Sequence, residues 1–306
     1  MIELTDVSKS YGRHKALSGA NAHIPTGCVF GVVGINGAGK STLLRLMTGV
    51  LRADGGEIKY DGQNVFENEG VKRNIFFLPD EPYYGGNTTG KDLERLYSAY
   101  YPFSKGIFAT WCKQFSLNVN APIRNFSKGM KRQLFLALAI ASQPRYLLLD
   151  EAFDGLDPGA RLFFKRALID MCDDAGCTAV IASHSLRELS DICTHFALIS
   201  EGKTVCGGDL NENLQSIHKF QIAFPHAVRR SDFASDAIKC DITGRVATLI
   251  VQGSADAFRE EINKLSPLFV EEIPVDFEEF FLIKTQRSDS EYNILQEGNN
   301  ETVDSL

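Results

Sequence analysis

A glycine-rich loop near residue 40 carries the strongest chemical signal in the chain. It satisfies the phosphate-loop pattern G-x-x-x-x-G-K-[ST] between an apolar, strand-like run and a helical pattern. Its glycines allow backbone N–H groups to point at a phosphate, Lys40 adds positive charge, and Ser41 offers a hydroxyl to Mg²⁺. We expect a nucleoside triphosphate here, because an ordinary turn rarely has this sequence in this context. The residues expected to hold it are Gly34, Asn36, Gly37, Ala38, Gly39, Lys40, Ser41 and Thr42.

A pair of carboxylates closes another apolar run. Residues 146–149 are typical of a buried strand, and Asp150 and Glu151 follow them directly. If this strand lies beside the phosphate loop, Asp150 can hold Mg²⁺ through its water shell, and Glu151 can polarise the attacking water as a general base. The alternative is a pair that only caps a helix. The phosphate loop in the same chain favours the catalytic interpretation.

A short motif before a helical pattern indicates the family. Phe126-Ser127-Lys128-Gly129-Met130 resembles the signature motif of ABC ATPases, whose usual form is Leu-Ser-Gly-Gly-Gln. Its distances along the chain from the phosphate loop and from Asp150 suit an ABC nucleotide-binding domain. Ser127 and the backbone of Gly129 would lie at a helix N-terminus, which is favourable for a γ-phosphate. The resemblance implies that this phosphate belongs to the nucleotide of the other subunit.

Three further positions extend the resemblance. Tyr11 fits the aromatic residue that stacks on adenine, residues 155–157 fit the loop that crosses the dimer interface, and His184 fits the switch histidine. His184 follows an apolar run at 178–181, where it could sense the γ-phosphate and steer water with Glu151. Taken alone, Tyr11 and His184 would more often be ordinary packed or solvated residues. The ordered set of motifs favours the functional interpretation.

Two loops depart from the family pattern. Asp80 stands where the family normally has a Gln that acts as a Mg²⁺ ligand and a hinge, and we expect this shorter, charged side chain to reach the metal through water. In the signature, Lys128 replaces Gly and Met130 replaces Gln, whereas Ser127 and Gly129 are retained. We therefore expect an active ATPase with ATP and Mg²⁺ as its ligands.

Strands and helices must alternate to position these residues. Residues 1–10 alternate as a short strand does, and runs typical of buried strands lie at 28–33, 75–78, 146–149, 178–181 and 196–199. Helical spacing appears at 92–100, 134–141 and 160–173. This alternation predicts an α/β fold in which ligands bind at the carboxyl ends of parallel strands. With the resemblance, we expect a P-loop NTPase of ABC type, with a mixed, mainly parallel sheet and a helical subdomain.

The length of 306 residues favours about two domains. We expect an ABC nucleotide-binding domain at 1–215, a small α+β domain of unknown role at 216–286 and an acidic, disordered tail at 287–306. The second domain is expected to contain strands at 219–224, 245–251 and 269–275 and a helix at 254–265. A regulatory or dimer-supporting role for this domain is left open.

Composition excludes several classes of protein. A hydrophobic content of 44% argues against wholesale disorder, and a net charge of −7 lacks the basic excess of a nucleic-acid binder. No apolar stretch approaches the ~20 residues of a membrane span, and the first residues lack the features of a secretory signal. We therefore expect a cytoplasmic protein. The scattered cysteines, without a Cys-x-x-Cys pair, are expected to be reduced and mostly buried.

These features predict the ATP-binding and ATP-hydrolysing subunit of an ABC transporter. The resemblance implies a separately encoded membrane permease, pairing with a second copy or a paralogue, and a peripheral position at the inner face of the cell membrane. The loop at Asp80 and the signature at Ser127 look most like those of bacterial exporter-type subunits, which implies export as the direction. The stretch from Tyr83 to Tyr101 lies where the family contacts its permease, although it could equally form helical core.

The alternative is a soluble ABC ATPase with a mechanical or regulatory role. Translation-type members resemble two tandem domains and repair-type members insert long coiled coils, whereas this chain has one phosphate loop and a short interval before Ser127. A P-loop kinase would leave the signature motif unexplained.

Overall fold

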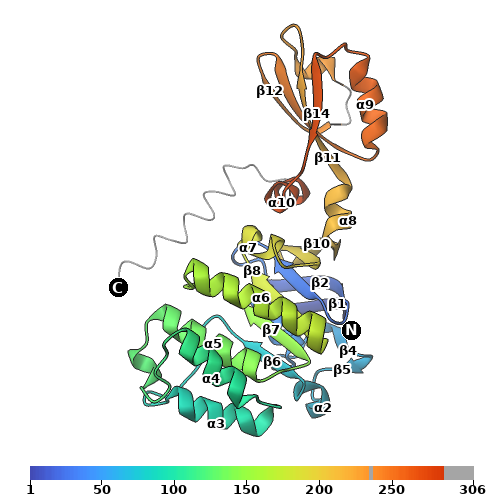
Figure 1. Ribbon diagram of the computed structural model, residues 1–306. Helices are drawn as coiled ribbons and strands as arrows, with labels where there is room; N and C mark the ends of the chain where they lie inside the picture. The colour runs from blue at the N-terminus through green and yellow to red at the C-terminus, as the bar shows by residue number, and fades with distance from the viewer. Residues whose placement is uncertain (234–236, 286–306) are drawn as a thin grey trace. The chain divides into compact units, whose positions relative to one another are not determined.

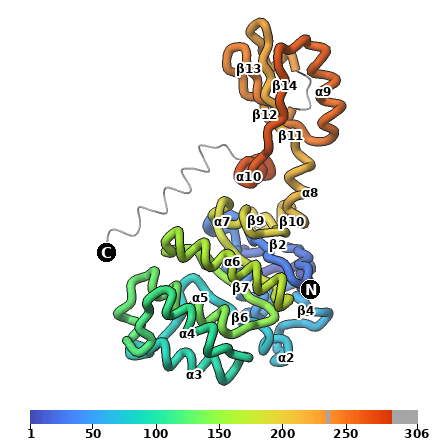
Figure 2. The backbone as a smooth tube through the Cα atoms, viewed as in Figure 1, coloured from blue at the N-terminus to red at the C-terminus, as the bar shows by residue number. Residues whose placement is uncertain are grey.

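The computed structural model describes residues 1–233 and 237–285. The chain divides into two compact units, the first Met1–Gly208 and the second beginning at Asp209 (Figures 1 and 2). The division comes before the boundary expected at residue 215, because the helix α8 (Leu210–Gln215) contacts the first strand of the second unit. The expected tail, 287–306, lies outside the described residues.

A six-stranded sheet forms the centre of the first unit, in the order β10-β9-β3-β8-β7-β6. Its strands are β3 (Val29–Val33), β6 (Ile75–Leu78), β7 (Tyr146–Asp150), β8 (Thr178–Ser183), β9 (His195–Ser200) and β10 (Lys203–Asp209). The pairs β9-β3, β3-β8, β8-β7 and β7-β6 are parallel. Every residue of β3, β7 and β8 is buried, as expected for parallel strands covered on both faces. The predicted parallel α/β core is confirmed.

A second, four-stranded sheet has antiparallel pairs in the order β2-β1-β4-β5. Its strands are β1 (Ile2–Tyr11), β2 (His14–Ile24), β4 (Gly55–Tyr60) and β5 (Gln63–Asn64). Only the first of these was anticipated. Side chains of β1, including Leu4, belong to the same hydrophobic cluster as Phe30 of β3 and Leu44 of the following helix. One core therefore holds both sheets together.

The helices of the first unit include a group in the middle of the sequence (green in Figure 1). The helices of this unit are α1 (Lys40–Met47), α2 (Glu69–Lys72), α3 (Gly90–Tyr100), α4 (Lys105–Gln114), α5 (Lys128–Ala141), α6 (Pro158–Ala175) and α7 (Leu186–Ser190), with a 3₁₀ helix at Ile123–Asn125. The green group consists of α3, α4 and α5. α5 contacts α3, α4 and α6. It is anchored by a run of buried apolar side chains from Leu134 to Ala141 and capped by Ser127, whose Oγ accepts the backbone N–H of Met130 at 3.2 Å. This group forms the expected helical subdomain.

The second unit is an antiparallel sheet, ordered β12-β13-β11-β14, with helices. Its further elements are β11 (Ile217–Ala223), a 3₁₀ helix (Arg230–Asp232), β12 (Ala237–Thr243), β13 (Val246–Gln252), α9 (Ala255–Asn263), β14 (Phe269–Ile273) and α10 (Phe277–Thr285). Phe220, Leu249 and Ile262 belong to a hydrophobic cluster formed within this unit. Strands and a helix occur where they were expected, whereas α8, β12 and α10 were not anticipated. The functional division of the chain stays a prediction.

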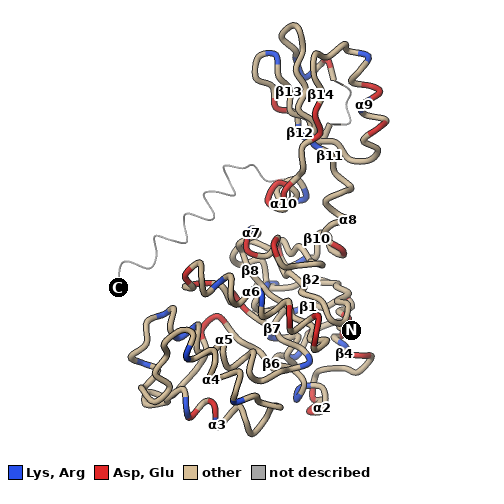
Figure 3. Tube along the Cα trace, viewed as in Figure 1, with Lys and Arg blue, Asp and Glu red and all other residues tan. Residues whose placement is uncertain are grey.

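The cysteines and the charged residues are distributed as in a globular protein. None of the seven cysteines, all of which lie in the described part of the chain, forms a disulfide, and five of them are buried. Acidic and basic positions are interspersed along both units (Figure 3). Within residues 1–233 and 237–285, no helix combines the length and apolar character needed to cross a bilayer.

Candidate active site

The phosphate loop joins the buried strand β3 to α1, and close packing explains two of its glycines. A Cβ atom at Gly34 would lie 2.4 Å from the carbonyl oxygen of Ile199. Gly39 has a φ of +107°, and a Cβ atom there would lie 2.4 Å from the carbonyl oxygen of Ala16. Neither position therefore has room for a side chain. Because no side chain covers the backbone at these two glycines, the loop backbone can face a ligand.

Lys40 points back into its own loop. Its side chain is 5% exposed, and its Nζ donates hydrogen bonds to the carbonyl oxygens of Gly34 at 2.7 Å and Ile35 at 3.2 Å. Nζ also lies 3.5 Å from Oε1 of Glu151. Burial lowers the pKa of Lys40, and the negative charges of Glu151 and Asp150 oppose that shift. The loop thus encloses a cation next to the carboxylate pair.

The remaining loop residues lie around this cation. Asn36 and Gly37 are exposed at the tip of the loop, and Ala38 is buried beneath it. Ser41 and Thr42 are half-buried in the first turn of α1. The residues expected to hold the phosphates, from Gly34 to Thr42, therefore belong to one turn and the helix start that follows it, and their contacts with a nucleotide stay a prediction.

Strand register brings Asp150 to the loop. Asp150 pairs with Ala182 of β8, while the next residue of β8, Ser183, pairs with Val33 at the end of β3. Parallel strands in this register end at one edge of the sheet, which is where the phosphate loop begins. The prediction from sequence that Asp150 lies near the phosphate loop required the ends of these strands to meet at one edge, and the strand register meets this requirement.

Asp150 has an unsatisfied oxygen. The residue is 2% exposed, and its Oδ1 has no hydrogen-bond partner among the described residues. Burial raises the pKa of Asp150, a hydrogen bond from Ser41 opposes the rise, and the charges of Glu151 and Asp80 add to it. A buried carboxylate oxygen without a partner is costly, and carboxylate and hydroxyl oxygens are ligands that Mg²⁺ prefers. Asp150 and Ser41 therefore fit a divalent cation.

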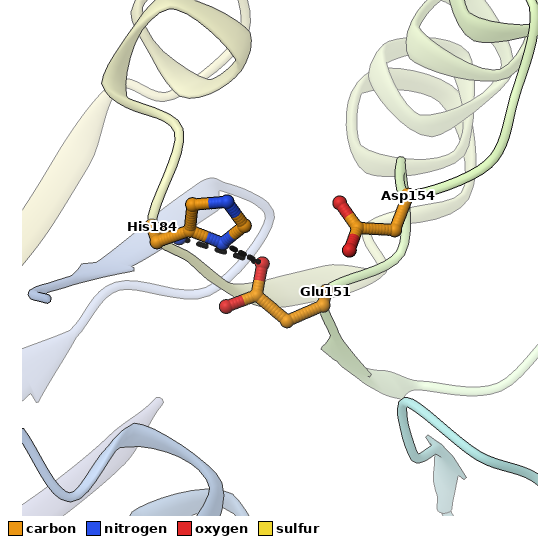
Figure 4. Close-up of side chains that lie close together, drawn as sticks. All are labelled: Glu151, Asp154 and His184. Carbon is orange, nitrogen blue, oxygen red and sulfur yellow. Dashed lines mark hydrogen bonds and ion pairs between the residues drawn. The ribbon is translucent and has the colours of Figure 1, made fainter. Parts of the chain in front are cut away.

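Glu151 is held by a histidine and a lysine. Its Oε2 lies 2.9 Å from Nδ1 of His184 (Figure 4). Its backbone N–H donates to the carbonyl oxygen of Ala182 at 2.9 Å. Its φ of +47° lies in the left-handed region. Burial raises the pKa of Glu151, but the His184 hydrogen bond and the charge of Lys40 outweigh burial and hold it below its usual value. Glu151 is thus ionised and able to accept a proton.

His184 follows β8 and faces Glu151 (Figure 4). The hydrogen bond to Glu151 raises the pKa of His184, whereas burial opposes the rise. A carboxylate only accepts, so the ring nitrogen Nδ1 donates in this contact. The structure therefore brings together the two residues predicted to act on water.

Asp154 joins this pair and was not singled out in the sequence. Its carboxylate points toward Glu151 and His184, and one ligand atom from each of the three residues lies within 4.8 Å of the others (Figure 4). Burial and the charge of Glu151 raise the pKa of Asp154. Only its position between Glu151 and the 155–157 loop could have pointed to it.

The signature motif lies against the 155–157 loop. Ser127 is exposed and caps α5, and a Cβ atom at Gly129 would lie 2.8 Å from the carbonyl oxygen of Gly155. The side-chain carbons of Lys128 pass beside Gly155. The structure thus groups Ser127 and Gly129 with this loop, and their expected contact with a second subunit's nucleotide stays a prediction.

Asp80 has a partner that the sequence did not reveal. It follows β6, and its Oδ1 lies 2.7 Å from a guanidinium nitrogen of Arg132 on α5. Its expected role toward Mg²⁺ stays a prediction, because the observed contact is with a cation of the protein itself.

Tyr11 ends β1 with a side chain that is 46% exposed. The ammonium of Lys9 lies 6.0 Å from the centre of its ring. Exposure leaves the ring accessible to a planar base, and the predicted stacking on adenine is not tested by these contacts.

Comparison with known proteins adds to this geometry. The profile of the ABC transporter family matches residues 17–154. The ABC transporter ATP-binding protein YtrB of Bacillus subtilis is 29% identical over 285 residues, which are 93% of this chain and 98% of that protein. The lantibiotic transport ATP-binding protein SrtF of Streptococcus pyogenes is 31% identical over 228 residues, which are 73% of this chain and 98% of that protein.

Solved structures share the fold. The dimeric, post-hydrolysis state of an ATP-binding cassette bound to ADP and phosphate matches with a TM-score of 0.62 and 22% identity. The match covers 69% of this chain and 99% of that chain.

Proposed function

Because the chain belongs to the ATP-binding proteins of the ABC transporter family, whose activity is ATP hydrolysis, we propose that it powers export through a separately encoded membrane permease. The observation that carries this proposal is the similarity to SrtF, a protein named for transport, over 98% of its length. The resemblance of the Asp80 loop and the signature to exporter-type subunits supports the direction. Such a subunit would lie at the inner face of the membrane, bound to the permease.

The residues of the site support a division of labour in hydrolysis. Ser41 and Asp150 would hold Mg²⁺, which when bound neutralises charge on the β- and γ-phosphates. Lys40 would exchange its backbone carbonyl acceptors for phosphate oxygens. Glu151 would accept a proton from the attacking water, and the hydrogen bond from His184 would keep its carboxylate aimed.

The stretch from Tyr83 to Tyr101 contains residues that suit each of its two expected roles, helical core and contact with a permease. Tyr97 and Tyr101 are half-buried and pack on the buried Phe76, with ring centroids at 5.3 and 5.4 Å, and therefore cover the edge of the core. Tyr83 and Tyr100 are 95% and 72% exposed. Exposed aromatic side chains are enriched at protein interfaces, so we propose these two for contact with the permease.

We expect the chain to co-purify from its own membranes with the product of a neighbouring gene that encodes about six apolar segments of ~20 residues. Changing Tyr83 and Tyr100 together to Asp should reduce recovery of that protein about 10-fold or more, because charge replaces apolar contact area. Mass spectrometry of the affinity-purified complex measures the effect. Leu162→Asp, at a residue that is 52% exposed on α6, is the matched control.

A membrane fraction that never yields such a partner would contradict transport. It would favour the alternative of a soluble ABC ATPase with a mechanical or regulatory role. ATPase activity of the purified chain separates this result from a failed preparation.

We also propose that two copies, or this chain and a paralogue, join through ATP. Ser127 at the start of α5 would contact the nucleotide of the opposite subunit, so ATP would bind the dimer and shift association toward it. Glu151→Gln protein should therefore dimerise with ATP and Mg²⁺ and remain monomeric with ADP. Light scattering measures the mass of the complex.

Adding Ser127→Arg to Glu151→Gln should prevent this dimer through steric conflict at the γ-phosphate. Asn125→Arg, an exposed position two residues earlier, introduces the same charge as a control. Because Ser127 caps α5, a melting curve must show that the variant is folded. Equal dimerisation with and without Ser127→Arg would contradict the signature assignment.

A further inference from the structure

We propose that Arg132 is a positioning residue that ties the Asp80 loop to the signature helix, so that Asp80 acts through this ion pair and not as a metal ligand. One guanidinium nitrogen of Arg132 lies 2.7 Å from Oδ1 of Asp80, and the other donates to the carbonyl oxygen of Pro79 at 3.4 Å. Both contacts join α5 to the loop after β6. The inference rests on the proposed Mg²⁺ site at Asp150.

Burial makes this contact necessary. The Arg132 side chain is 4% exposed, and a guanidinium keeps its charge in proteins. A buried charge requires a partner, and removing that partner is strongly destabilising. Asp80 and the Pro79 carbonyl supply acceptors for Arg132, so the position of the loop is fixed relative to α5.

The carboxylates near Asp80 also favour its ion pair with Arg132. Asp80 lies close enough to the site that its charge adds to the raised pKa of both Asp150 and Asp154. A neutral Gln at this position would need no counter-ion, whereas a carboxylate beside other carboxylates does. Arg132 supplies the positive charge that makes Asp80 tolerable there.

The side chains of Arg132 and Asp80 differ in their exposure to solvent. Arg132 is fixed by its buried place on α5, while the Asp80 side chain is 51% exposed. The pair also borders a hollow of about 360 Å³ lined in part by Tyr84 and Phe135, which leaves room on the side of the loop. Movement of the loop would therefore act on the helix whose first turn carries Ser127 and Gly129.

Three variants test the pair by thermal unfolding of the full chain. Asp80→Ala should lower the melting temperature by about 3–8 °C, because it leaves the buried guanidinium without its carboxylate. Arg132→Met should lower it less, since Asp80 is then left near water. Combining the two should recover at least half of the loss caused by Asp80→Ala, because the buried charge has gone. Arg124→Met, at an exposed residue before α5, is the control and should change nothing.

A metal titration separates positioning from ligation. We measure the Mg²⁺ concentration that gives half-maximal binding of a fluorescent ATP analogue. Asp150→Asn should raise it by about 10-fold or more, whereas Asp80→Ala should change it by less than about twofold. An equal rise in both variants, or melting losses that simply add, would overturn the inference. If Asp150→Asn left the Mg²⁺ concentration for half-maximal binding unchanged, the proposed Mg²⁺ site would be overturned instead. The melting temperatures would still test the ion pair between Arg132 and Asp80.

Discussion

Glu151→Gln should slow ATP hydrolysis by about 100-fold or more while the affinity for ATP changes by less than about threefold. The substitution removes a proton acceptor and keeps the shape of the side chain. Burial raises the pKa of this carboxylate, but the contacts with His184 and Lys40 outweigh burial and hold it below its usual value, so a neutral amide removes the basic group itself. Phosphate release in a single turnover measures the first quantity, and equilibrium titration with a fluorescent ATP analogue measures the second.

Glu69→Gln is the matched control for this variant. Glu69 lies on α2 with a side chain that is 88% exposed, so the same chemical change should leave turnover as it is in the unaltered chain. If purified Glu151→Gln protein hydrolysed ATP at the unaltered rate, Glu151 would not be the general base.

Lys40→Ala should weaken ATP binding by about 100-fold or more, because the β- and γ-phosphates lose a charge-assisted partner in the loop. The buried Nζ now donates to the carbonyl oxygens of Gly34 and Ile35, so the variant also loses two contacts that hold the loop. Equilibrium titration gives the dissociation constant, and a melting curve shows whether the fold survives.

The exposed Lys15 offers a control of equal charge, since Lys15→Ala changes net charge without touching the loop. A dissociation constant that is the same for Lys40→Ala and the unaltered chain would mean that residues 34–41 form an ordinary turn.

The central sheet could be predicted because strands that are buried on both faces are rich in consecutive apolar residues. β3, β7 and β8 consist mainly of apolar residues, and each is buried throughout. β2 mixes polar and apolar residues and pairs with β1 through several register shifts, so no simple period marks it. β12 alternates only between half-buried and exposed positions, which explains why it too was not anticipated.

The site was predictable where its residues follow strands. The phosphate loop, Asp150 and His184 come directly after β3, at the end of β7 and after β8, so the topology of a parallel sheet alone brings them together. Arg132 and Asp80 are separated by 52 residues and meet through the packing of α5 against a loop. No spacing rule in a single sequence encodes such a contact.

The backbone conformation at Glu151 affects the thermal stability of the protein. A left-handed conformation costs an L-residue about 1–2 kcal/mol, and glycine adopts it freely. Glu151 holds a φ of +47° at the exit of β7, so its backbone conformation is unfavourable for folding, and its side chain is the one proposed to act on water. Glycine at this position would relieve the backbone but would leave the buried Lys40 without its carboxylate neighbour, so the two effects of such a substitution on thermal stability oppose each other.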